Sequence, residues 1–220
     1  MLYSYELDFL KRKIAERDWP SARKIALDCT RYIDDLLTVN FPTFSEIRYQ
    51  PGGIYPPGLK LLSTGSGANV DYMDMQVNQN ARFGIYTSIF DKRLDKKYAD
   101  IRVVRYPAWS SALSDTCKLG IVNSQMARAH DLCSRPRDFS YSTAVVIHRM
   151  IIGNGYDEHA VYKRMRSFLS RRSNGGSLYS GMSNRRLEER IHAFFGHLRS
   201  GRITPGPNGM VVHHGVIQGR

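Results

Sequence analysis

The seven residues RYIDDLL, at positions 31–37, place two adjacent carboxylates between apolar side chains. Carboxylate oxygens are the hard ligands that Mg²⁺ prefers, and two such ions together stabilise the attacking and leaving oxygens of an in-line displacement at phosphorus. Neighbouring residues of a strand point to opposite faces, so Asp34 and Asp35 reach one site only if they lie at a turn. The competing interpretation is a solvated hairpin tip, because Asp is also a common turn residue.

The segment around these carboxylates predicts a strand, a tight turn and a second strand over residues 25–39, with the turn at or near Ile33 to Asp35. Ile33 on one side and Leu36-Leu37 on the other indicate a hairpin pressed into a core. Unpaired carboxylates in a core are costly, so this setting favours a bound cation.

Helices and a second hairpin surround this segment in the sequence. Residues 5–18 predict an amphipathic helix, stopped by Trp19-Pro20, with three apolar residues on one face: Leu7, Leu10 and Ile14. Alternation over 70–77 and 83–90 predicts a β-hairpin with Met73, Met75 and Val77 on one face. The spacing predicts further helices over four ranges: 117–133, 138–152, 157–169 and 185–199. Asp138 and Asp157 are predicted to cap the second and third of these helices.

The tail from Gly201 is predicted to be poorly ordered. This order of elements predicts an α+β fold.

Positive charge is the strongest global property of the chain. Lys and Arg number 32 against 20 Asp and Glu, which gives a net charge of +12 and a pI near 9.8. Such a balance favours a polyanionic partner, because phosphate contacts release condensed counterions. A cluster in the helical half is the predicted nucleic-acid-binding surface: Lys163, Arg164, Arg166, Arg171 and Arg172. The competing interpretation is a solvated helix face.

Several classes of protein are disfavoured. Cys29, Cys117 and Cys133 share no CxxC spacing, which argues against a zinc finger and a disulfide framework. No apolar run approaches the length of a membrane span, and the charged N-terminal segment does not resemble a signal peptide. We therefore expect an intracellular protein, nuclear or cytoplasmic, that is neither secreted nor held in a membrane.

RYIDDLL resembles the Tyr-x-Asp-Asp motif of reverse transcriptases. Other segments resemble reverse transcriptases of eukaryotic retroelements in matching order over most of residues 2–170. They are LYSYELDFL at 2–10, IYPPGLKL at 54–61, VDYMDMQV followed by IFDKR, and RYPAWSSALSDTCKLGIVNSQMARAHDLCSRPRDF. The resemblance implies a partial polymerase palm of antiparallel hairpins with a helix, followed by a helical thumb-like region.

The resemblance also implies roles for individual residues. Asp34 and Asp35 correspond to metal-binding catalytic carboxylates that hold Mg²⁺ or Mn²⁺, and Tyr32 corresponds to a residue near the primer end or the template-paired nucleotide. Lys60 is a candidate general acid for the leaving pyrophosphate. The resembled enzymes carry their lysine slightly later, where this chain has Leu62 and Ser63, so a solvated surface lysine is the favoured interpretation of Lys60. The implied partners are an RNA template with a DNA primer, an RNA–DNA duplex and a dNTP.

One departure from the family concerns what precedes the first helix. In the resembled enzymes a further palm aspartate and the fingers region come before the segment that matches residues 2–10. We therefore expect residues 1–107 to be a partial palm, 108–173 a thumb-like region, and 174–220 a linker, an amphipathic helix and a flexible tail. A partner chain is one source of the rest of the palm.

The leading hypothesis is a truncated RNA-directed DNA polymerase domain of retrotransposon type. Its reaction would be nucleotidyl transfer to a primer 3′-hydroxyl, and whether this chain is active alone is left open. The alternative is a non-enzymatic basic nucleic-acid-binding module derived from a polymerase. A third hypothesis, a metal-dependent nuclease that uses Asp34 and Asp35, is disfavoured because no general base or third ligand is evident in the sequence.

Overall fold

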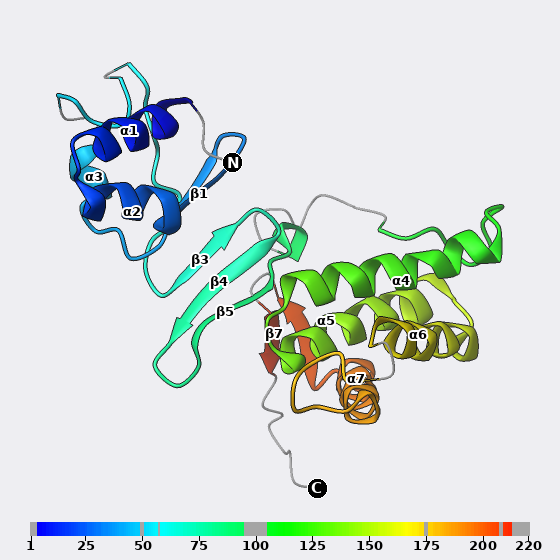
Figure 1. The fold of residues 1–220 in the computed structure, drawn as a ribbon. Coiled ribbons are helices and arrows are strands. Elements are labelled where there is room, and N and C mark those ends of the chain that lie inside the picture. The colour runs from blue at the N-terminus through cyan, green and yellow to red at the C-terminus, as the bar shows by residue number, and fades with distance from the viewer. Residues whose placement is uncertain are drawn as a thin grey trace, which may run out of the picture. The chain divides into compact units, whose positions relative to one another are not determined.

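The computed structural model of the chain describes residues 4–48, 51–56, 58–94, 105–173, 176–206 and 209–212. Helices are combined with small antiparallel sheets, so the predicted α+β class is confirmed. Packing divides the chain into two compact units, Met1–Ser66 (unit 1) and Gly67–Arg220 (unit 2) (Figure 1). The predicted division into a partial palm (1–107), a thumb-like region (108–173) and a C-terminal part (174–220) stays a prediction.

Unit 1 starts with two helices that pack against each other, α1 Ser4–Ala15 and α2 Trp19–Asp28. The Asp18 carboxylate caps α2 by accepting a hydrogen bond from the backbone N–H of Ser21 at 3.3 Å, and Pro20 lies in the first turn. The helix predicted over 5–18 ends at Ala15, and Trp19-Pro20, which was predicted to stop it, begins the next helix. Proline suits a first helical turn, whose N–H groups have no intrahelical partner. The predicted strand over 25–39 is therefore helical up to Asp28.

The remaining elements of unit 1 are a short hairpin and a one-turn helix. Strands β1 Cys29–Tyr32 and β2 Asp35–Thr38 pair antiparallel, and α3 Phe44–Ile47 follows. A small apolar core joins them to the first two helices: Phe9, Ile25, Cys29, Phe41, Ile54 and Tyr55. The face of α1 that is buried carries Glu6 and Phe9, whereas Leu7 and Ile14 are 40% and 44% exposed, so the predicted apolar face is wrong in part.

A buried ionic network connects distant parts of unit 1. The Glu6 carboxylate on α1 is 1% exposed in its side chain, and Arg31 on β1 is 9% exposed. The Arg31 guanidinium donates to Glu6 Oε1 through Nε at 2.7 Å and to the Tyr55 hydroxyl through Nη2 at 2.7 Å. The Tyr55 hydroxyl in turn donates to Glu6 Oε1 at 2.5 Å. This network holds the first helix, the hairpin and the segment around Tyr55 together.

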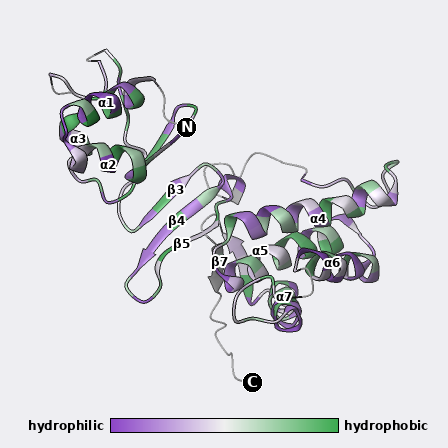
Figure 2. Ribbon diagram, viewed as in Figure 1, coloured by the Kyte–Doolittle hydropathy of each residue, from purple (hydrophilic) through white to green (hydrophobic). Residues whose placement is uncertain are grey.

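Unit 2 opens with a three-stranded antiparallel sheet of β3 Asn69–Tyr72, β4 Met75–Asn80 and β5 Gly84–Ile89. The predicted single strand over 70–77 is wrong, because Met73 takes a φ of +58° and Tyr72 pairs with Met75 across a two-residue turn. Figure 2 shows that β4 is largely hydrophilic.

Four helices form the larger part of unit 2: α4 Asp115–Leu132, α5 Pro136–His148, α6 Glu158–Arg172 and α7 Asn184–Arg199. A 3₁₀ turn, Lys92–Leu94, follows the sheet, and a π-helical turn, Arg149–Gly153, follows α5. The helices share one core that includes Val122, Met126, Phe139, Ile147, Met165, Leu187 and Ile191. None of the helices in the described part of the chain has the length and apolar content needed to cross a bilayer.

The predicted helix caps are partly confirmed. Asp157 caps α6 by accepting from the Ala160 backbone N–H at 2.7 Å. Asp138 instead lies inside the first turn of α5, which Pro136 begins, and its carboxylate binds Arg135. The predicted poor order of the tail is wrong for the described residues after Gly201, since β6 Ile203–Gly206 and β7 Gly209–Val212 form a hairpin. The sequence IRVVRYP at residues 101–107 predicts a short strand ended by Pro107, and this segment lies mostly outside the described residues.

Replacing Glu6 by alanine is expected to destabilise unit 1 by about 3–5 kcal/mol, because the guanidinium of Arg31 stays buried without its carboxylate. Hydrogen exchange of the backbone amides of α1 and α2 measures the change. Asp8→Ala, on the exposed side of the same helix, is the control and should change stability by less than about 0.5 kcal/mol. Similar losses in both variants would contradict a structural role for the network.

Candidate functional site

The two adjacent carboxylates lie at the tip of the hairpin in unit 1. Tyr32 pairs with Asp35 across the strands, which leaves Ile33 and Asp34 as a two-residue turn. Ile33 takes a φ of +52°. The predicted position of the turn is confirmed, and the turn places both carboxylates at one end of the hairpin.

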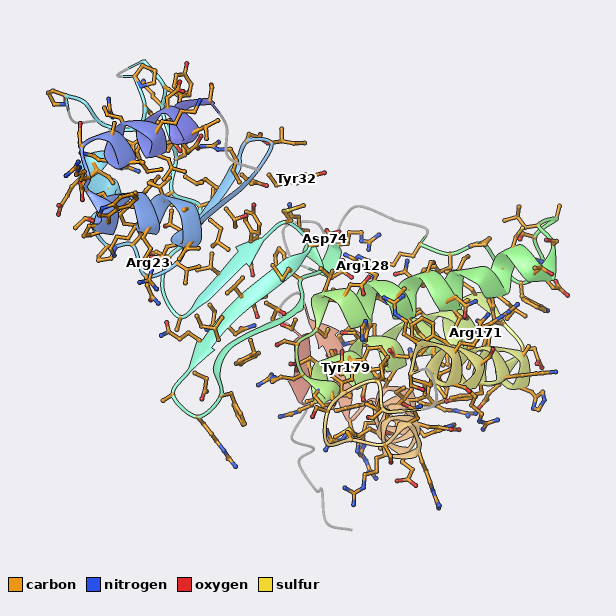
Figure 3. The ribbon with its side chains drawn as sticks, in the orientation of Figure 1. Arg23, Tyr32, Asp74, Arg128, Arg171 and Tyr179 are labelled. Carbon is orange, nitrogen blue, oxygen red and sulfur yellow. The ribbon has the colours of Figure 1, made fainter. Side chains whose placement is uncertain are left out.

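The tip of this hairpin is exposed. Asp34 and Asp35 are both in the exposed class, and Tyr32 is 53% exposed. Cross-strand partners lie on the same face, so the Tyr32 ring and the Asp35 carboxylate are neighbours. Figure 3 shows Tyr32 at the end of the hairpin. Only Leu36 of the flanking apolar residues packs against the core, so the expectation of a buried, cation-requiring tip is wrong.

The carboxylates fit part of a magnesium site. Within the described residues, no hydrogen bond or ion pair engages the side chain of Asp34 or Asp35, so their oxygens are available as ligands. The same described residues contain no group of three or more His, Cys, Asp or Glu side chains that could hold a metal ion. Magnesium usually completes its octahedron with waters and substrate phosphates. In such a site the pair would supply two ligands, and the other ligands would have to come from elsewhere.

The arginine of RYIDDLL does not point toward the carboxylates. Arg31 lies on the inner face of the hairpin, where Glu6 and Tyr55 bind it. Burial raises the pKa of Tyr55, so its hydroxyl remains protonated and can donate to Glu6 at neutral pH. Sequence reasoning missed this role, because Glu6 is 25 residues away from its partner.

Lys60 lies in an irregular, exposed segment of unit 1. In the described part of the chain, it forms no hydrogen bond or ion pair with Asp34 or Asp35. Its role as a general acid stays a prediction.

The predicted basic surface lies on α6 in unit 2. Its apolar side faces the core through Val161, Tyr162, Met165, Phe168 and Leu169. At about 100° per residue, Lys163, Arg164 and Arg171 lie within one sector of the helix away from this apolar side. Lys163 and Arg171 are exposed, and Arg164 is half-buried. Figure 3 shows Arg171 on α6 among many nitrogen-bearing side chains. These three residues form what we call the α6 basic face.

The other two predicted arginines are occupied. Arg166 Nε donates to Glu188 Oε1 of α7 at 2.6 Å, and Arg172 Nη2 donates to Asp131 Oδ1 of α4 at 3.1 Å. Both arginines are about half exposed, and such surface pairs contribute only about 0.2–1 kcal/mol. A phosphate can therefore compete for them, although their first role is to join neighbouring helices.

Sequence reasoning also missed a cluster around Asp91 in the IFDKR segment. Its carboxylate accepts hydrogen bonds from Arg105 and from Arg93 Nε, the latter at 3.1 Å, and lies 3.5 Å from Arg149 Nη1. Although burial opposes it, hydrogen bonds from Arg105 and Arg93 and their charges lower the pKa of Asp91. The cluster joins the end of the sheet to the π-helical turn after α5.

Asp74 is the second carboxylate at a hairpin turn. It lies in unit 2 and pairs with Arg128 Nη2 of α4 at 2.9 Å (Figure 3). Its side chain is 66% exposed, and it lies in the two-residue turn between β3 and β4. Its pairing makes it a structural contact within unit 2.

Comparisons of the chain with family models, curated proteins and solved structures gave no match. The resemblance to reverse transcriptases therefore depends on the sequence segments quoted above.

Asp91→Asn is expected to destabilise unit 2 by about 1.5–3 kcal/mol at neutral pH, the range for hydrogen bonds to charged groups. Because the pKa of Asp91 is lower in the fold than its ordinary value of 3.8, the native chain gains stability above pH 3.8 and loses it as the pH falls through the folded pKa. The variant should lack this part of the acid dependence. Urea unfolding between pH 2.5 and 7 measures it.

Asp115→Asn is the control for that measurement, because Asp115 is 69% exposed and pairs with Lys118 only at 3.6 Å. The control should lose less than about 1 kcal/mol. An acid dependence that is unchanged in Asp91→Asn would contradict the ionic role of the cluster.

Proposed function

We propose that the chain is a reverse-transcriptase-like domain whose hairpin in unit 1 holds catalytic metal ions. The observation that carries the proposal is the free pair Asp34 and Asp35 at a two-residue turn, in a motif that resembles the polymerase Tyr-x-Asp-Asp. A turn is the geometry that allows adjacent carboxylates to reach one site. Their exposure leaves room for a nucleotide and a primer end.

The proposed reaction is attack of a primer 3′-hydroxyl on the α-phosphorus of a dNTP. A new phosphorus–oxygen bond forms to the primer, and the bond to pyrophosphate breaks. Bound Mg²⁺ or Mn²⁺ would stabilise the attacking and leaving oxygens. Asp34 and Asp35 would supply carboxylate ligands, and the exposed ring of Tyr32 would orient the primer terminus or the paired nucleotide. The third palm carboxylate is expected from an upstream segment or a partner chain.

The α6 basic face is the proposed contact for the phosphate backbone of an RNA–DNA duplex. Lys163, Arg164 and Arg171 form no ion pair within the described residues. Contacts of this kind position a duplex without reading its sequence. A non-enzymatic nucleic-acid-binding module is the second candidate, favoured by the missing third carboxylate among the described residues.

Asp34→Asn is expected to lower primer extension by more than about 100-fold. Even the loss of a residue that only hydrogen-bonds to a metal ligand lowers metal affinity or activity by about 10–100-fold. The assay contains the full chain, an RNA template with a DNA primer, dNTPs, and Mg²⁺ or Mn²⁺. Asp8→Asn is the control, as an exposed aspartate outside the hairpin.

A second readout separates metal binding from activity. Mn²⁺ should broaden the NMR signals of residues 33–36 in the native chain and not in Asp34→Asn. Broadening without extension would support a metal-binding remnant of a polymerase. Equal broadening in both proteins, or extension that survives the substitution, would contradict the assignment of Asp34.

Charge reversal of the α6 basic face, with Lys163, Arg164 and Arg171 all changed to Glu, is expected to weaken binding of an RNA–DNA duplex. The slope of log K against log salt should fall by roughly 1 for each lost phosphate contact. Fluorescence anisotropy over 50–200 mM salt measures it. The control changes net charge equally through three exposed residues of unit 1: Lys11, Arg17 and Arg23. Equal weakening by both triple variants would mean that general charge, rather than this face, binds the duplex.

A further inference from the structure

A partly open cavity of about 230 Å³ lies in unit 2, between the sheet and the helices. Its floor is the face of β4 and β5 that turns inward, where Gln76 lies opposite Ser88 and Asn78 lies opposite Tyr86. Helix α5 contributes Tyr141, among other residues, and α7 contributes Phe194. All of these residues belong to one compact unit.

The more buried face of β4 is the polar one. Met75 and Val77 share a face, as predicted, and are only partly buried, while Gln76 and Asn78 on the other face are each 5% exposed. Buried polar groups are costly unless they are hydrogen-bonded. The sheet therefore places two amides where an apolar core would be more stable.

These amides are only partly satisfied by the protein. Gln76 Nε2 donates to Asp71 Oδ1 at 2.9 Å, and Asn78 Nδ2 donates to the Gln76 carbonyl at 3.2 Å and to Ser88 Oγ at 3.3 Å. Within the described residues, the side-chain oxygens of Gln76 and Asn78 accept no hydrogen bond. The two amides line the cavity, where a ligand can donate to the oxygens that the protein leaves without a donor.

The charged residues at the cavity limit the class of that ligand. Arg135 is neutralised by Asp138, to which it donates through Nε at 2.6 Å and Nη2 at 3.0 Å, and its guanidinium lies 3.4 Å from the centre of the Tyr86 ring. Arg137 is exposed and forms no ion pair in the described part of the chain. The lining thus offers neutral amides and aromatic rings inside, with one available cation at its exposed edge.

We propose that this cavity binds a nucleobase, with the phosphate of the same nucleotide at Arg137. Asn and Gln side chains pair with the edges of bases, and aromatic rings stack on unstacked bases. The volume lies below the roughly 300–1,000 Å³ of sites for drug-sized ligands, which suits one base and excludes a long peptide or lipid chain. The cavity lies in unit 2 alone and needs no metal, so its occupancy is independent of the carboxylates at the hairpin tip.

Binding of 5′-AMP, 5′-GMP, 5′-CMP and 5′-UMP to the full chain tests the proposal, measured by ligand-observed NMR. We expect at least one nucleotide to bind, and Asn78→Leu to weaken it by about 10-fold or more, the value of a good amide–base pair. Its melting temperature should fall only modestly, because the substitution also removes the two hydrogen bonds that Asn78 Nδ2 donates. Arg137→Ala should weaken the nucleotide and leave binding of the matching nucleoside unchanged.

Asn123→Leu is the control, because Asn123 on α4 carries a buried Oδ1 without a partner among the described residues and does not line the cavity. It should leave nucleotide binding unchanged. Ribose 5-phosphate, which lacks a base, should not compete. Competition by ribose 5-phosphate at the same concentration would overturn the proposal in favour of an anion site. A large fall in melting temperature in Asn78→Leu, with no nucleotide bound by the native chain, would overturn it in favour of a structural role.

Two sources can present a base to the cavity, a free nucleotide or a base extruded from a single strand. A short single-stranded oligonucleotide and the same strand with one abasic position distinguish them. If the intact strand competes with 5′-AMP and the abasic strand does not, the cavity binds a base that belongs to a strand. Binding of the mononucleotide without competition by either strand supports a free nucleotide.

Discussion

The ion pair between Glu6 and Arg31 is the interaction on which unit 1 depends. It joins helix α1 to the hairpin across 25 residues of sequence, and Tyr55 completes it from a segment 49 residues from Glu6. Few apolar side chains make up the core of this unit, so the network fixes the hairpin where packing alone would leave it weakly held. Glu6 Oε2 is buried without a partner among the described residues, which makes the network costly to bury and more damaging to break.

The two units use the same turn for different purposes. Tyr32-Ile33-Asp34-Asp35 in unit 1 and Tyr72-Met73-Asp74-Met75 in unit 2 both close an antiparallel pair with two residues, the first of them at positive φ. Arg128 neutralises the second turn's aspartate, whereas no cation of the described chain pairs with the first. Local charge, rather than backbone shape, distinguishes the two turns, because only the turn at Asp74 is fastened to a helix by an arginine within the described residues.

Local patterns predicted the long helices and the turn at Asp34, because periodicity and caps operate within a few residues. They missed α2, where Pro20 starts a helix, and they merged β3 with β4, because Met73 gives no sign of a positive φ. The apolar spacing of Leu7 and Ile14 was misleading, since the short core of unit 1 prefers the side of α1 that carries Glu6. Networks between distant residues, such as the one around Asp91, leave no local pattern at all.

The backbone of Ile33 has a consequence for the carboxylate beside it. A β-branched residue at a φ of +52° is strained, at a cost of order 1–3 kcal/mol, and such strain persists only where the surrounding structure imposes it. Here the pairing of Tyr32 with Asp35 and the packing of Leu36 impose it. The tip is therefore preorganised. The backbone entropy of both residues is lost when the chain folds, so a ligand of these carboxylates would meet a backbone already fixed in one conformation.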